Sequence, residues 1–148
     1  MKTIFDKTTT DELIRRINSL NENSTAQWGK MTVYQMMKHC RMWEEMLSGK
    51  IQCKRIFLGR LIGSIALKHE LKDETPMGRN SPTSVELKVT ESNIDLESER
   101  AKWIALIEAH EHFSNPNFVH PFFGEMTKEQ IGYFAYKHTD HHLRQFNC

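Results

Sequence analysis

Histidine is the residue type in this sequence best suited to chemistry, and its spacing near the C-terminus is the most informative pattern. The chain has 148 residues and eight histidines, and His138, His141 and His142 lie close together. At ~100° of rotation per residue, one helical face carries both His138 and His142. The same face carries the apolar residues Ile131, Phe134 and Ala135. We therefore expect His138 and His142 to point into the protein core.

Two inward histidines four positions apart favour a bound cation. Their Cβ atoms are ~5 to 6 Å apart in a helix, and protonating either ring would bury a charge beside the other. A divalent metal removes this conflict, because neutral imidazole nitrogens are standard ligands of Zn²⁺ and also suit Ni²⁺ and Fe²⁺. The alternative is that both are core histidines satisfied by hydrogen bonds.

A third ligand would have to come from another helix, because facing helices supply the inward side chains of a bundle. His39 is the candidate, since it lies at the edge of the inward face of the second predicted helix. His120 precedes a proline in a loop that could form a wall of the same pocket. The other histidines are better explained as surface or helix-end residues, namely His69, His110 and His112. The sequence thus predicts a metal site made of His39, His138 and His142.

Apolar periodicity predicts the helices that would position these residues. Thr9 with Glu12 has the spacing of a capping box that opens a first helix, and Thr127 with Gln130 has the same spacing before the last one. Thr32 is the expected N-cap of the second helix. Two more helices are predicted, over residues 56–71 and 95–113, and the first of these carries glycines four apart that indicate close helix packing.

The segment 85–89 has a different pattern. Val85, Leu87 and Val89 alternate with polar residues, which predicts an extended segment with one buried side. No second alternating run offers a partner strand, so we expect this segment to lie as a strap across the helices. The predicted fold is all-α: an antiparallel four-helix bundle with an additional short helix and an extended strap, forming one domain over residues 1–148.

Composition excludes several classes of function. Lys and Arg total 20 against 19 for Asp and Glu, so the net charge of +1 gives no field for nucleic acid or anionic lipid. No apolar stretch approaches the ~20 residues needed to span a membrane. The N-terminal segment lacks the pattern of a secretory signal, so we expect a cytoplasmic protein. Its three cysteines, Cys40, Cys53 and Cys148, have no CxxC spacing and are expected to be reduced.

Three segments together resemble one known superfamily. They are Trp28-Gly-Lys-Met-Thr-Val-Tyr-Gln-Met-Met-Lys-His39-Cys, His120-Pro-Phe-Phe-Gly124 and His138-Thr-Asp-His-His142-Leu-Arg-Gln-Phe146. The sequence resembles the DinB/YfiT-like superfamily of metalloenzymes, in a branch known only as a domain of unknown function. The resemblance spans most of the chain and implies a four-helix bundle whose metal ligands are His39, His138 and His142.

The sequence departs from the superfamily pattern in the last segment, and the resemblance does not identify a substrate. Relatives often read His-His-Arg-Gly-Gln there, whereas Leu143 separates His142 from Arg144 and the glycine is absent. Relatives with an assigned activity resemble transferases that use a thiol cofactor, and no segment here is identifiable as a thiol-binding site. The substrate therefore does not carry over.

The predicted site supports two kinds of function. Three histidines would leave a coordination position open for water or a substrate thiolate. We therefore expect a hydrolase or a thiol-dependent transferase acting on a small molecule, in a pocket near the aromatic loop 118–123. No general base is evident, although Glu44, Glu45 and Glu125 lie in nearby segments.

The alternatives are a non-catalytic, stress-associated bundle that binds a metal or ligand, and a purely structural bundle without metal. The predicted partners are a small-molecule substrate, no nucleic acid and no membrane. A homodimer formed through the apolar helix 56–67 is also expected.

Overall fold

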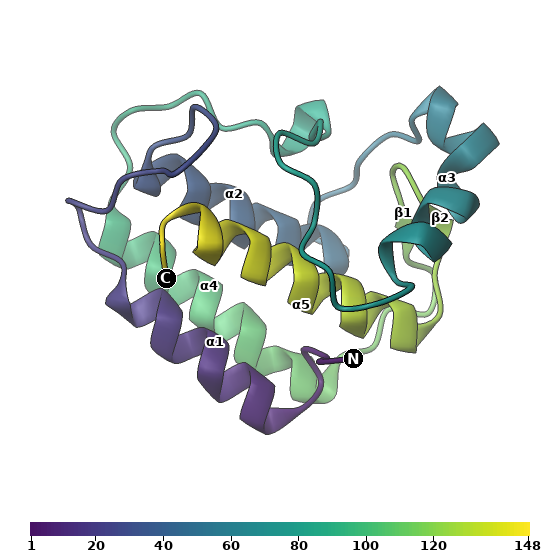
Figure 1. The fold of residues 1–148 in the computed structure, drawn as a ribbon, viewed down its shortest axis with the longest axis horizontal. Coiled ribbons are helices and arrows are strands. Elements are labelled where there is room, and N and C mark those ends of the chain that lie inside the picture. The colour runs from purple at the N-terminus through teal and green to yellow at the C-terminus, as the bar shows by residue number, and fades with distance from the viewer.

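Five α-helices make up most of the structure, a computed structural model that describes residues 1–148 (Figure 1). They are α1 (Lys7–Ser19), α2 (Val33–Leu47), α3 (Phe57–Glu70), α4 (Leu96–Glu108) and α5 (Lys128–Gln145). Short 3₁₀ turns add η1 (Val85–Leu87) and η2 (Ala109–His112). Helices account for 54% of the chain, which confirms the prediction of a mainly helical protein.

Side-chain caps explain where the functional helices begin. The Thr32 hydroxyl accepts from the Gln35 backbone N–H, and the Gln35 side chain accepts in return from the Thr32 N–H. Thr127 and Gln130 form the same reciprocal box ahead of α5. Both caps were predicted from the sequence and both are confirmed.

The predicted start of the first helix is wrong. Asp6, rather than Thr9, is the N-cap of α1, and its carboxylate accepts from both the backbone N–H and the hydroxyl of Thr9. Asp is a strongly favoured N-cap residue. The N-cap of the helix therefore lies three positions before the predicted one at Thr9. Glu12 pairs instead with Lys2.

The helices pack so that α5 is covered on two sides. Helix α4 packs against α1 and α2, and α5 also contacts α1 and α2 (Figure 1). Each of these helices places side chains in one continuous core, among them Leu13, Ile17, Met36, Trp103, Ile107 and Leu143.

Burial of α5 extends to its polar face. Helical projection alone places Asp140 opposite His138 and His142, which would predict a solvated carboxylate; this is wrong, because its side chain is only 9% exposed and lies beneath α1. Arg16 of α1 donates to Asp140 at 2.8 Å, and Arg144 donates to it at 2.6 Å. These two guanidinium groups supply the compensating charge that allows a carboxylate to be buried.

The strap was predicted correctly in place but not in conformation. It lies against α2, yet its centre forms the 3₁₀ turn η1. Only Leu87 is buried, and Val85 is 81% exposed, so the expected alternation of buried residues is absent. With no partner strand, the backbone N–H groups of Leu87 and Lys88 bond locally to the carbonyls of Ser84 and Val85.

A small hairpin in the aromatic loop was not predicted. Strand β1 (Val119–His120) pairs antiparallel with β2 (Gly124–Glu125). Helix α3 packs on the turn between them at one end of the molecule (Figure 1). A Cβ at Gly59 or Gly63 would lie 2.3 or 2.2 Å from the Phe122 carbonyl oxygen. The two glycines therefore do mark close packing, but against the backbone of a turn and not against another helix.

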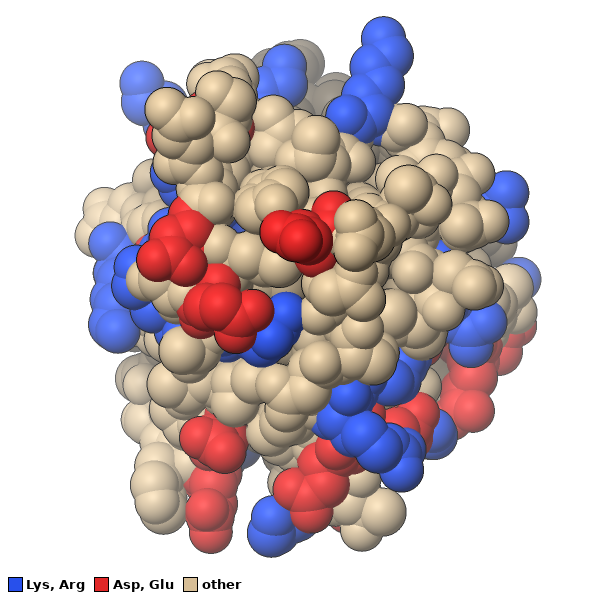
Figure 2. Space-filling model, turned by 90° about the vertical axis from the view of Figure 1, so that its left-hand side faces the viewer, with Lys and Arg blue, Asp and Glu red and all other residues tan.

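The surface carries both signs of charge. On the face shown in Figure 2, basic and acidic side chains are interspersed among uncharged ones. This pattern matches the small net charge of +1. No helix of the structure combines the length and the apolar character needed to cross a bilayer.

Candidate metal centre

His39, His138 and His142 converge in the protein interior. One ring nitrogen from each lies within 4.8 Å of the others, and the residues are 4%, 8% and 6% exposed. The ring of His39, from α2, lies 5.5 Å from that of His138 and 5.0 Å from that of His142, between centroids. The two rings from α5 are 4.7 Å apart. The three residues selected from the sequence are thus brought together by the contact between α2 and α5.

Hydrogen bonds fix the tautomers of two of these rings. His39 Nδ1 lies 2.9 Å from the Leu87 carbonyl oxygen, which can only accept, so Nδ1 carries the proton. His142 Nδ1 lies 2.9 Å from Gln145 Oε1. The Gln145 amide is oriented by its own Nε2, which donates to the Trp28 carbonyl at 2.9 Å. The Nε2 lone pairs of His39 and His142 are therefore left for another ligand.

His138 is held in a different way. Its ring stacks on Trp43, with centroids 4.3 Å apart and planes 19° apart. Its Nδ1 is buried and has no hydrogen-bond partner. Buried polar nitrogens without a partner are rare and unfavourable. A cation bound by these three rings would be held by nitrogen lone pairs for which the protein itself supplies no hydrogen-bond donor.

Burial keeps all three imidazoles in their neutral form. It places the pKa of His138 and His142 well below the usual histidine value of 6.5, and the neighbouring rings lower these values further. Burial also lowers the pKa of His39, against an opposing effect of its bond to Leu87. Neutral imidazole is the form that binds metals. The electrostatics of the site therefore suit a divalent cation.

His120 lies in the aromatic loop outside the trio. Its Nδ1 accepts from the backbone N–H groups of Phe122 and Phe123 at 3.2 and 3.1 Å, so its proton must be on Nε2. Burial, with a contribution from Arg55, lowers the pKa of His120 to about 3. It is a neutral N–H donor at pH 7, with no free lone pair for a metal.

The position of His120 agrees with the hypothesis that the aromatic loop forms a wall beside the site. Its ring lies 5.5 Å from that of Phe134, which is 6.4 Å from that of His138. The Phe123 ring stacks on His120 at 4.6 Å and also packs on Phe134 at 4.9 Å. The loop thus reaches the row of α5 side chains that ends in the predicted ligands.

The remaining histidines divide into exposed and buried ones. His69 and His112 are exposed, as expected. His110 was expected to be a surface or helix-end residue; it does lie just past the end of α4, but it is 5% exposed, with Nε2 2.6 Å from a carboxylate oxygen of Glu44. Its spacing of three from the buried Ile107 was the available signal. His141 packs edge-on against Trp28, 5.5 Å between ring centroids, and burial lowers its pKa.

None of the acidic candidates for a general base belongs to the trio. Glu44 is engaged by His110, Glu45 pairs with Arg41, and Glu125 is exposed on β2. Cys40 does not provide a nucleophile either, because burial raises the pKa of its thiol well above the usual 9.0. All three cysteines are free, as predicted.

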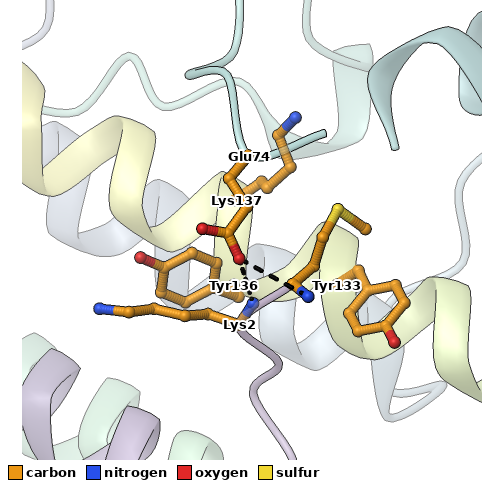
Figure 3. Close-up of a pocket in the computed structure, with 6 residues that line it drawn as sticks. Lys2, Glu74, Tyr133, Tyr136 and Lys137 are labelled. Atoms are coloured by element: carbon orange, nitrogen blue, oxygen red, sulfur yellow. Dashed lines mark hydrogen bonds and ion pairs between the residues drawn. The ribbon is translucent and has the colours of Figure 1, made fainter. Parts of the chain in front are cut away.

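Two hollows lie on the face of α5 opposite to the trio. The larger, of about 180 Å³, is bordered by Lys137, Asp140 and Arg144 of α5 and by Lys2 and Glu74. Figure 3 shows the adjoining small one, where Glu74 accepts from the Lys2 backbone N–H at 3.0 Å. Helical projection places these α5 residues about half a turn away from His138 and His142. The hollows are therefore separate from the three histidines of the candidate metal centre.

Sequence reasoning missed one residue of the centre. Gln145 is 3% exposed and joins His142 to the Trp28 carbonyl. Its position three residues after His142, on the same helical face, was the only available signal.

Comparison with known proteins gives a family but no characterised relative. No curated protein and no solved structure matches the chain. One family matches nearly the whole sequence, over residues 2–148, and its description is "Protein of unknown function (DUF1569)". The chain therefore belongs to the DUF1569 family.

Proposed function

We propose that His39, His138 and His142 bind a divalent metal ion, with zinc, nickel and iron as the candidates. The observation that carries this proposal is the convergence of three neutral, buried imidazoles within 4.8 Å. Two of them have Nδ1 committed to fixed acceptors, as metal-binding histidines usually do. Their chemistry suits borderline cations that prefer nitrogen ligands.

We further propose that the fold is a four-helix bundle of the DinB/YfiT-like kind. The pairwise packing of α1, α2, α4 and α5 supports this assignment. So does the origin of the three histidines, with one from α2 and two from α5, which is the distribution that the resemblance implies. Helix α3 would be the additional element outside the bundle.

The function proposed for this centre is that of a metal-dependent enzyme acting on a small molecule, either a hydrolase or a thiol-dependent transferase. A bound divalent ion would supply Lewis acidity, which generates hydroxide or thiolate at neutral pH. Within this chain, Leu87 and Gln145 hold the ligand rings in their tautomers. His120 offers a neutral N–H donor on the loop side. The trio includes no carboxylate, so the proton released from the acidified water or thiol would have to pass to solvent or to a base outside the trio.

Metal content tests the first part of the proposal. Elemental analysis of the purified protein should find about one transition metal per chain. Cobalt(II) substitution should give the visible spectrum of a nitrogen-ligated ion. His39→Ala, His138→Ala and His142→Ala should each lose the metal while keeping most of their helical circular dichroism. The exposed His69→Ala and His112→Ala are matched controls and should keep it. Equal metal content in all five variants would contradict the assignment.

A non-catalytic metal-binding bundle is the second candidate, and the depth of the site favours it. Each ligand is less than a tenth exposed, which suits a closed structural clamp. The two candidates differ in whether the ion accepts an outside ligand. Titrating the cobalt protein with a small thiol should produce a sulfur-to-cobalt charge-transfer band if a position is open. An unchanged spectrum at millimolar thiol would favour the clamp.

A further inference from the structure

Helix α3 presents a broad apolar face to the outside of the molecule. Five large side chains are exposed along it: Phe57 (77%), Leu58 (53%), Leu61 (64%), Ile62 (42%) and Ile65 (68%). Helical projection places all five within an arc of ~140°. We call this set the α3 ridge. The other exposed large apolar residues are Ile56, which directly precedes the α3 ridge, and Met1, Val85 and Val119, which lie apart from it in the sequence.

The α3 ridge belongs to a helix that is firmly held from its other side. Gly59 and Gly63 allow the helix to lie directly on the Phe122 backbone. At its N-terminal end, Arg55 donates to the carbonyl oxygens of His120 and Pro121 at 2.7 and 2.9 Å.

The C-terminal end of α3 is also fixed. The buried Lys137 donates to the Glu70 and Asp73 carbonyls, and its ammonium group pairs with the Glu70 carboxylate at 3.3 Å. A helix anchored at both ends presents the α3 ridge as a preformed surface.

We propose that the α3 ridge is a homodimer interface, in which it packs against the same ridge of a second copy of this chain. Its side chains expose roughly 600 Å² per chain, so that two copies would bury roughly 1,200 Å², the lower limit for a stable interface. Contacts around the ridge would add to this area. An uncovered apolar patch of that size is at the upper limit for a monomeric protein.

The composition of the α3 ridge favours its own copy as the occupant. Apolar side chains occupy this face from Phe57 to Ile65, so a two-fold axis centred on that part can bring identical surfaces together without burying a charge. The exposed cations of the helix, Arg60 and Lys68, lie at a margin and near its end. There their long side chains can keep the charge in water.

A lipid surface is a poorer match for the α3 ridge. The ridge contains no Trp or Tyr to anchor in the headgroup region, and the protein carries a net charge of only +1. The proposal is independent of the metal, although α3 packs on the turn between β1 and β2 that leads to His120.

Sedimentation equilibrium or light scattering on the purified full chain, between 1 and 100 µM, tests this proposal. The expected mass is that of a dimer. Leu61→Glu should give a monomer, and the milder Leu61→Ala should raise the dissociation constant about tenfold. Both variants should keep the wild-type circular dichroism, because Leu61 is exposed. Val85→Glu changes an exposed apolar residue outside α3 and should leave the dimer intact.

Three results would overturn the proposal. One is a wild-type chain that remains monomeric at 100 µM. Another is a dimer that Leu61→Glu does not affect. The third is flotation of the monomer with vesicles of anionic phosphatidylglycerol, lost in Leu61→Glu, which would assign the α3 ridge to a lipid surface.

Discussion

The ligand rings of the candidate centre depend on neighbours that are not ligands. The Leu87 carbonyl and the Gln145 amide each engage an Nδ1, which leaves the Nε2 lone pairs of His39 and of His142 for another ligand. Leu87 contributes through its backbone, so its side-chain identity is not required for that bond. Gln145 contributes through its side chain, and it is therefore the neighbour whose substitution tests the arrangement.

We predict that Gln145→Leu weakens metal binding by about 10- to 100-fold, the usual effect of losing a partner of a ligand histidine. Leucine fills a similar volume but leaves both His142 Nδ1 and the Trp28 carbonyl without their bonds. Competition with a chromophoric chelator measures the affinity. Gln52→Leu, at an exposed glutamine, is the control. Equal affinities in the two variants would show that the amide does not support the site.

At the scale of elements, α2 and α5 supply the three histidines of the candidate centre, while the aromatic hairpin and α3 form a second layer at one end. The contact between these two layers is unusually close, because α3 meets the Phe122 carbonyl through glycines. Alanine is ordinarily favoured over glycine in a helix by about 0.5 to 1 kcal/mol. This propensity and the steric clash therefore act in opposite directions at the same position.

We predict that the clash dominates at Gly63. A Cβ there would lie 2.2 Å from the Phe122 carbonyl oxygen and 3.1 Å from its carbon, and backbone atoms cannot move aside as a side-chain end can. Gly63→Ala should lower the free energy of unfolding by about 1 to 3 kcal/mol, the usual cost of overpacking. Urea unfolding measures this loss. In Gly78→Ala the new methyl group meets nothing within 4 Å, so its stability should stay within about 0.5 kcal/mol of wild type.

Hydrogen exchange would show where the Gly63→Ala effect is located. Faster exchange should be confined to α3 and the β1–β2 hairpin. A Gly63→Ala protein as stable as Gly78→Ala would contradict the close packing seen in the structure.

At the scale of the whole molecule, the buried histidines couple folding to pH. Their pKa values lie below the ordinary 6.5, which is close to the value in the unfolded chain. In the range between these values, the unfolded chain binds more protons than the folded one. Lowering the pH through that range therefore favours unfolding. Above about pH 7 these groups are neutral in both states and add no pH dependence.

We predict that the metal-free protein loses stability as the pH falls below about 6.5, by up to ~1.4 kcal/mol per pH unit for each such histidine. Urea unfolding at pH 7.5, 6.5 and 5.5 measures this slope, and His138→Phe should reduce it. Saturating zinc at pH 7.5 should raise the stability through its binding to the folded state alone. A stability that stays flat between pH 7 and 5 would contradict the burial of neutral rings.

The sequence by itself determined the five helices, apart from the start of α1, and the chemically capable residues. Thr32 and Thr127 mark helix starts because a capping side chain bonds to its own neighbours, which is a local interaction. The spacing of His138 and His142 on one face follows from helical geometry alone. The choice of His39 as the third member needed only the apolar periodicity of its helix and the rule that helices of a bundle face one another.

Only the tertiary structure decided what surrounds those residues. The burial of Asp140 depends on Arg16, more than a hundred positions away in the chain, and the burial of His110 depends on Glu44. The 3₁₀ turn in the strap arises because no partner strand is present to accept its hydrogen bonds. Spacing along the chain reveals which face a side chain occupies. Helix packing decides which distant group neutralises or orients that side chain. The local spacing of residues does not encode this packing.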